Sequence, residues 1–117
     1  MWYGDIWTQE YLTKTSDEIS NKLQELKQKT IEAKTNGDRA EIINQLKDIN
    51  NILGKTDNTW SIIVVHQELD NVEQAFTKVK SNIENGTLET ALQEIETTIY
   101  FVEHVKDRER LCLKNIF

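Results

Sequence analysis

Two histidines, His66 and His104, are the only imidazole side chains that could bind a metal ion or transfer a proton. Folding the chain back at Asn85-Gly86 brings His66 level with about residue 105, so both histidines lie at a similar height. At about 100° per residue, however, His66 sits at the edge of its apolar stripe, whereas His104 points nearly opposite its own. Metal ligands must converge, and the Glu-x-x-His spacing of metal-binding bundles does not occur. The sequence therefore predicts no metal site, with His66 paired either to Asp70 one turn further on or to a neighbouring helix.

Nucleophilic catalysis has little support in this sequence. Cys112, the only cysteine, stands between Leu111 and Leu113 rather than beside a base. The chain contains no glycine-rich phosphate loop, no Cys-x-x-Cys pair and no Ser-His-Asp order with supporting turns. Its formal net charge of −6 repels phosphate backbones, so nucleic acid is not an expected partner. We expect no catalytic residue, no cofactor and no enzymatic activity.

The outer face of the last helical stretch carries aromatic rings where charged side chains are usual. Tyr100 and His104 are one turn apart on this face, and Phe101 lies next to them. Aromatic residues are enriched at the centres of protein interfaces. Tyr100 and His104 are therefore predicted to contact a protein partner or a second copy of the chain. The other interpretation is that they are scattered surface rings.

Four helical stretches must position these side chains. Apolar residues recur every three or four positions over 5–34, 38–53, 57–84 and 87–107. Asn36-Gly37 and Asn85-Gly86 tolerate the left-handed backbone that ends a helix, and Gly54 is expected to end the second stretch. Short connections favour antiparallel neighbours. The sequence predicts one all-α domain over residues 1–117, an antiparallel up-down-up-down four-helix bundle made of two helical hairpins.

The beginning of the third stretch is apolar nearly all round. Its seam contains Ile62, Val65 and Leu69, and three further apolar residues point away from that seam: Trp60, Ile63 and Val64. The first and third stretches are the longest, so they should overhang the bundle at the pole that also holds residues 1–11 and the apolar tail 108–117. Either the tail packs on this end of the bundle together with the opening aromatic residues, or the exposed apolar residues form a partner site.

The start of the chain leaves two interpretations open. No segment approaches the roughly 20 consecutive apolar residues that cross a bilayer. Residues 1–11 nevertheless contain Trp2, Tyr3, Trp7 and Tyr11, and such rings are enriched at membrane interfaces. Residues 1–11 are either a membrane-proximal start that follows an absent anchor, or a segment whose rings pack on the bundle.

Several short motifs in the second half of the chain occur together in an order typical of one family. They are the run from Trp60 to His66-Gln67-Glu68-Leu69-Asp70-Asn71-Val72, the Asn85-Gly86 turn, Val102-Glu103-His104 and the ending Leu113-Lys114-Asn115-Ile116-Phe117. Residues 60–117 thereby resemble an uncharacterised bacterial family, domain of unknown function 4363. Its members typically carry one N-terminal hydrophobic segment and occur in Gram-positive, often spore-forming, bacteria. The resemblance implies a helical domain at the outer side of the cell membrane, anchored by a segment absent from this sequence, and it implies no catalytic residue.

The leading hypothesis is a non-enzymatic helical interaction domain that binds a protein partner or forms a homodimer. It is expected to be membrane-anchored and extracytoplasmic in the full-length protein, and cytoplasmic if no anchor precedes it. The alternative is a small-molecule-sensing bundle with a pocket near His66 and Asp70. A metal-dependent enzyme is the third hypothesis.

Overall fold

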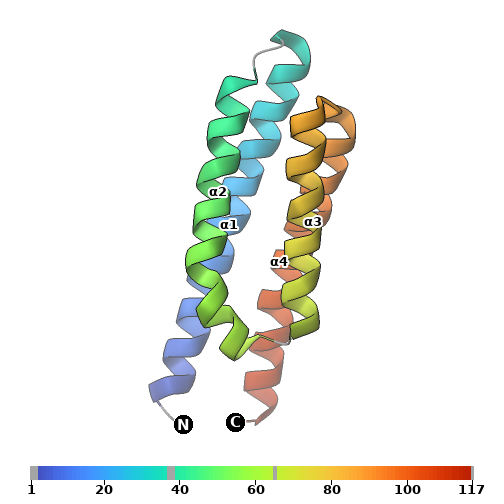
Figure 1. Ribbon diagram of the computed structural model, residues 1–117. Helices are drawn as coiled ribbons and strands as arrows, with labels where there is room; N and C mark the ends of the chain where they lie inside the picture. The colour runs from blue at the N-terminus through green and yellow to red at the C-terminus, as the bar shows by residue number, and fades with distance from the viewer. Residues whose placement is uncertain (1–2, 37–38, 65, 117) are drawn as a thin grey trace.

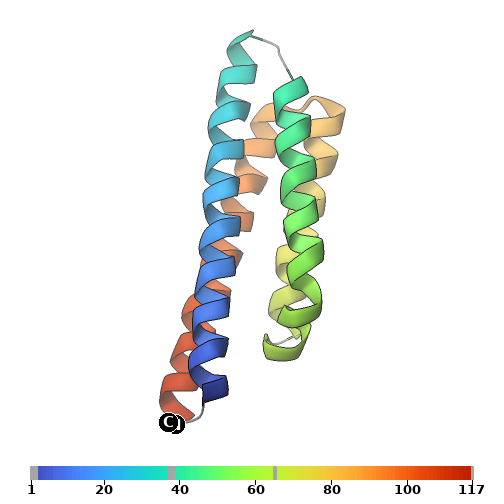
Figure 2. The ribbon, with the colours of Figure 1, turned by 90° about the vertical axis from the view of Figure 1, so that its left-hand side faces the viewer.

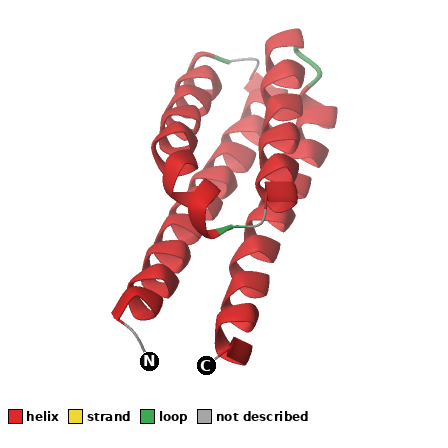
Figure 3. Ribbon diagram, turned by 60° about the horizontal axis from the view of Figure 1, so that its bottom comes forward, coloured by secondary structure: helices red, strands yellow, loops and turns green. Residues whose placement is uncertain are grey.

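The computed structural model describes the backbone of residues 3–36, 39–64 and 66–116, and the side chains of residues 10–35, 39–62, 64 and 66–107. The described backbone forms four helices and no strand (Figure 3). These helices are α1 (Tyr3–Asn36), α2 (Ala40–Ile63), α3 (His66–Asn85) and α4 (Leu88–Ile116). The predicted all-α class is confirmed.

The helices run alternately up and down, and both ends of the chain lie at one pole (Figures 1 and 2). Each helix packs on its two neighbours in the order α1, α2, α3, α4, and α4 also packs closely on α1, which closes the bundle. The α2–α3 pair is packed least. The molecule measures 52 × 19 × 19 Å, and the 34 residues of α1 span about 51 Å at 1.5 Å per residue. The predicted four-helix bundle of two hairpins is confirmed.

The core follows the apolar stripes of the sequence. Positions three, four or seven residues apart on α1 are buried: Leu12, Ile19, Leu23, Leu26, Thr30 and Ala33. In α3 and α4 the buried positions recur at the same three- and four-residue spacing: Leu69, Val72, Phe76, Val79, Ile83, Ala91, Ile95, Thr98, Ile99, Val102 and Val105. Burial of these faces against each other, rather than intrinsic helix propensity, supplies most of the stability of such helices.

The boundary between α2 and α3 differs from the prediction. Gly54 does not end a helix: α2 continues to Ile63, and the chain turns at Val64, whose backbone is extended with φ −112° and ψ 142°. A glycine inside a helix costs only about 1 kcal/mol, whereas the turns beyond Gly54 bury Thr56 and Trp60 completely or nearly so. Tertiary burial therefore overrides the local preference of one glycine.

This shift moves the apolar cluster of the predicted third stretch onto the end of α2. Trp60 becomes core, with 1% of its surface exposed, and Val64 is buried as well. Ile62, which was expected in the seam, is 82% exposed. The prediction for Ile62 was wrong because it assumed one continuous helix through the Val64 break. The side chains of Ile63 and Val65 lie outside the described residues.

The overhang of the bundle also differs from the prediction. Because α2 and α3 meet at residues 64–66, the helices that extend past this corner are α1 and α4, not α1 and α3 (Figure 1). The expected tail does not form a separate segment, since α4 continues as one helix to Ile116. The side chains of residues 1–9 and 108–117 lie outside the described residues, so their packing stays a prediction.

The turn between α3 and α4 forms as expected. Gly86 has φ 81°, the left-handed conformation that glycine adopts at low cost. The Gly86 N–H donates to the Ile83 carbonyl at 3.1 Å, and the Thr87 N–H donates to the Asn82 carbonyl at 2.9 Å. This pair of bonds is the Schellman motif of helix ends. The corresponding glycine of the first turn, Gly37, lies outside the described residues.

Gly54 offers a direct test of the continuous α2. A Cβ built at Gly54 meets nothing within 4 Å, so the Gly54→Ala variant should raise the free energy of unfolding by about 0.5–1 kcal/mol through lower backbone entropy in the unfolded chain. Urea titration followed by circular dichroism measures the change. A destabilised variant would indicate that the helix ends at Gly54 after all.

Candidate functional site

Three aromatic rings lie together on α4, and we call them the α4 aromatic face: Tyr100 and His104 are exposed, and Phe101 is half-buried and packs against the core. Tyr100 is 64% exposed, among the few large hydrophobic residues that are. Its ring stacks on His104 with centroids 6.0 Å apart and 11° between planes, and meets Phe101 edge-on at 5.7 Å. Rings that pack on one another lose little further side-chain freedom on binding, which suits a contact surface.

His104 also lies next to Glu68 of α3. The His104 Nε2 atom lies 3.7 Å from Glu68 Oε1, and the Glu68 side chain is 5% exposed. His104 was predicted to point almost opposite its seam; it lies on the surface of α4 but turns its ring edge toward α3. The 3.7 Å distance is longer than a hydrogen bond, and the contact is an ion pair when the imidazole is protonated.

Trp60 and Val64 do not contribute to an exposed surface. The Trp60 indole N–H donates to Thr15 Oγ1 at 2.9 Å, a buried hydrogen bond between α2 and α1. The Thr15 hydroxyl in turn donates to the Tyr11 carbonyl at 2.8 Å. Of the five predicted interaction residues, Tyr100 and His104 are therefore at the surface, Trp60 and Val64 are in the core, and the Ile63 side chain lies outside the described residues.

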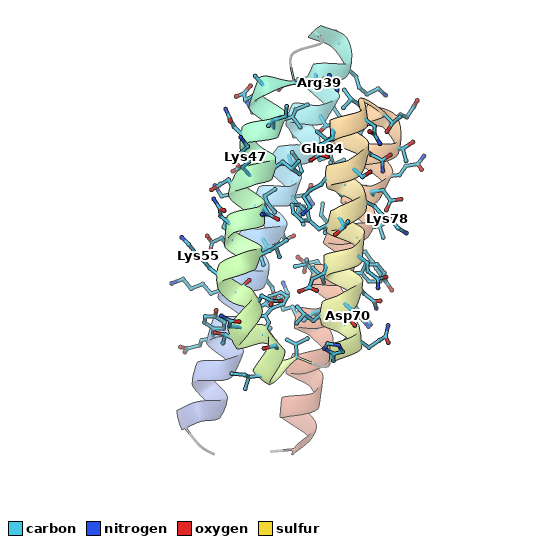
Figure 4. All side chains as sticks on the ribbon, viewed as in Figure 1. Arg39, Lys47, Lys55, Asp70, Lys78 and Glu84 are labelled. Atoms are coloured by element: carbon cyan, nitrogen blue, oxygen red, sulfur yellow. The ribbon has the colours of Figure 1, made fainter. Side chains whose placement is uncertain are left out.

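His66 and Asp70 pair as predicted. The His66 Nε2 atom lies 3.3 Å from Asp70 Oδ2, and the His66 side chain is 86% exposed. Asp70 lies near the lower end of α3 in Figure 4. A side chain this exposed is not enclosed by pocket walls, and three hollows formed by described residues are lined by other side chains. Nothing in this arrangement favours a ligand pocket at His66.

A pair of acidic residues bridges α2 and α3 close to His66. Asp57 of α2 accepts a hydrogen bond from the Glu73 carboxyl of α3; this bond, partial burial and the Asp57 charge raise the pKa of Glu73 to about 7. The Asp70 charge adds to the increase, and His66 opposes it. Sequence analysis missed this pair because it assigned Asp57 and Glu73 to the same helix.

The acidic pair predicts a pH dependence of stability. A carboxyl whose pKa is higher in the folded protein than in the unfolded chain contributes stability that is complete below the unfolded pKa. That contribution disappears as the pH rises through the folded pKa of Glu73, about 7. Since Glu73 is exposed, screening by water limits the effect to about 1 kcal/mol or less.

Glu73→Gln should remove most of this dependence, because glutamine still donates to Asp57 but does not titrate. Urea titrations at pH 5 and pH 8 measure it: the wild type should lose stability over this interval relative to Glu73→Gln. Glu84→Gln, on the same helix, is the matched control and should follow the wild type. Equal pH profiles for wild type and Glu73→Gln would contradict the proton-sharing pair.

The described residues contain no group of three or more His, Cys, Asp or Glu side chains arranged to hold a metal ion. Over the same residues, none of the helices combines the length and the apolar character that a bilayer crossing requires.

One comparison with known proteins is informative. A family model, Domain of unknown function (DUF4363), matches residues 6–116. The chain belongs to this family. The match confirms the resemblance carried by residues 60–117 and extends it through α1 and α2. No curated protein and no solved structure matches the chain.

Proposed function

We propose that this protein is a non-enzymatic interaction domain that binds a protein partner through the α4 aromatic face. The observation that carries the proposal is the 64% exposure of Tyr100 within a packed group of rings. Tyrosine at the centre of an interface contributes large contact area at low entropic cost, and its hydroxyl can form a hydrogen bond at the same time.

The fixed geometry of the face supports the same proposal. Tyr100 contacts the rings of both His104 and Phe101, and His104 lies 3.7 Å from the buried Glu68 carboxylate, so the ring pair has neighbours before a partner arrives. Preorganised side chains bind more tightly because less freedom is lost on association. The face also lies on the helix that packs on both α1 and α3, which makes α4 a rigid support.

We further propose that the domain is held at the outer side of the cell membrane in the full-length protein. Members of the family typically carry an N-terminal hydrophobic segment. In this chain α1 is one helix from Tyr3 and extends past the α2–α3 corner (Figure 1). An anchor that precedes α1 would hold the bundle by the pole at which α1 starts and α4 ends, which leaves the α4 aromatic face free along the side.

Site-specific photo-cross-linking in the native cell tests the proposal. A benzophenone amino acid at position 100 should yield a discrete cross-linked product of defined mass. The matched control is position 55: Lys55 is exposed on α2, which in the described part of the chain packs on α1 and α3 rather than on α4. If positions 100 and 55 give the same products, or if position 100 gives none at equal protein level, the α4 aromatic face is not a partner site.

A further inference from the structure

The lightly packed seam between α2 and α3 contains a groove of about 320 Å³. Its walls include, from α2, Ile43, Leu46, Lys47 and Asn50, and, from α3, Lys80 and Glu84. Figure 4 shows Lys47 and Glu84 at a similar height on the two helices. The volume lies at the small end of the range for ligand sites, about 300–1,000 Å³. The groove is therefore large enough for one small molecule.

One side of the groove is apolar and accessible. Ile43 is 41% exposed, and Leu46, which also lines the groove, belongs to the core. An isoleucine in this position leaves apolar surface in water, which a ligand could cover with a gain of about 25 cal/mol per Å². This wall favours a ligand with an apolar body.

The charges of the groove favour an anion. Five of the ten lysines whose side chains are described pair with carboxylates: Lys22, Lys27, Lys29, Lys34 and Lys106. Among the described residues, no carboxylate lies within ion-pairing distance of Lys47 or Lys80. Lys80 Nζ is instead held by Asn50 Oδ1 at 3.3 Å and lies 5.6 Å from the Phe76 ring centroid. Two ammonium groups thus line an apolar groove in a chain of net charge −6, with Glu84 as the only acidic group among the lining residues.

We propose that this groove binds a small amphiphilic monoanion of the medium-chain carboxylate class. Its hydrocarbon part covers Ile43 and Leu46, and its carboxylate pairs with the ammonium groups of Lys47 and Lys80. The site involves neither α4 nor its aromatic face, so it is independent of the proposed partner contact.

Three probes separate the components of this recognition in ¹H–¹⁵N NMR titrations of the ¹⁵N-labelled protein. Hexanoate has both the chain and the charge, hexanol has only the chain, and acetate has only the charge. Hexanoate should shift the amides of residues 43–51 and 80–84 in a saturable manner. Hexanol should bind the same residues at least about fivefold more weakly, since a charge-assisted contact is missing, and acetate should not saturate.

Two double lysine variants test whether the charge contribution to binding comes from the groove. Lys47→Gln/Lys80→Gln should weaken hexanoate binding about tenfold and leave hexanol binding unchanged, since two charge-assisted contacts are lost. Lys55→Gln/Lys78→Gln removes the same charge from the same two helices outside the groove (Figure 4) and should bind like the wild type.

Three results would overturn the proposal: hexanoate shifts that spread over the whole surface, equal losses in both double variants, or equal affinities for hexanol and hexanoate. Groove amides that respond only to protein concentration would assign the groove to a second copy of the chain instead.

Discussion

Replacing Trp60 with alanine is expected to lower the free energy of unfolding by about 3–5 kcal/mol, the usual cost of truncating a large buried aromatic residue. Trp60 is the largest fully buried side chain among the described residues. It fastens the last turn of α2 to α1 through the hydrogen bond to Thr15. Its removal therefore leaves a cavity and also frees the corner from which α3 begins. Urea titration of wild type and variant measures the loss.

Two further variants separate the contributions to this loss of stability. Trp60→Phe keeps most of the ring but removes the indole donor, so it should cost clearly less than Trp60→Ala. Ile62→Ala truncates an apolar residue two positions away that is 82% exposed, and a change at such a surface site should stay within about 0.5 kcal/mol. A Trp60→Ala variant as stable as Ile62→Ala would mean that Trp60 belongs to an exposed surface, as one sequence interpretation proposed.

The second large effect is expected at Gly86. Gly86→Ala should destabilise the protein by about 1–2 kcal/mol, because an L-residue pays this amount to adopt a left-handed backbone. The φ of Gly86 is 81°, and an added Cβ would lie 3.0 Å from Arg39 Nη1. The Arg39 side chain also donates to the Ile83 carbonyl at 3.4 Å, so the guanidinium that must move is one that helps to cap α3.

Gly86→Asn and Gly54→Ala are the controls for Gly86→Ala. Asparagine tolerates the left-handed conformation better than alanine, so Gly86→Asn should lie between wild type and Gly86→Ala. Gly54→Ala introduces the same methyl group into a helical position and should change stability in the opposite direction. Thermal unfolding ranks all four proteins. If the two alanine variants changed stability with the same sign, the contrast between a turn glycine and a helical glycine would be wrong.

The sequence predicted those parts of the fold that depend on local signals. Residue spacing predicts the buried face of α1 from Leu12 to Ala33 and the three- and four-residue periodicity of α3 and α4. Backbone preference predicts the Asn85-Gly86 turn. The position of the α2–α3 corner was not predictable in this way. Judged locally, Gly54 is a stronger signal for a helix end than Val64-Val65. The helix nevertheless continues past Gly54, because Trp60 is buried against α1.

The contacts of the candidate site also differ in whether local signals predict them. The His66–Asp70 pair is one turn apart on a single helix, and the outward direction of Tyr100 follows from its angle on α4. The contacts of His104 with Glu68 and of Asp57 with Glu73 join different helices. Predicting these contacts requires the relative positions of residues on neighbouring helices. Because the end of the second helix was predicted ten residues too early, the pair of Asp57 and Glu73 was missed.

Residue-by-residue amide hydrogen exchange, measured by NMR, tests most directly the claim on which these assignments depend, namely that α2 runs unbroken through Gly54 to Ile63 and α3 begins at His66. Amides of residues 54–60 should exchange roughly a hundredfold or more slowly than in an unstructured chain. The amides of His66 and Gln67 should exchange rapidly, because the first amides of a helix have no intrahelical acceptor. Rapid exchange over residues 54–57 together with unbroken protection from residue 60 to residue 70 would contradict the structure and return Trp60 to the surface of a longer third helix.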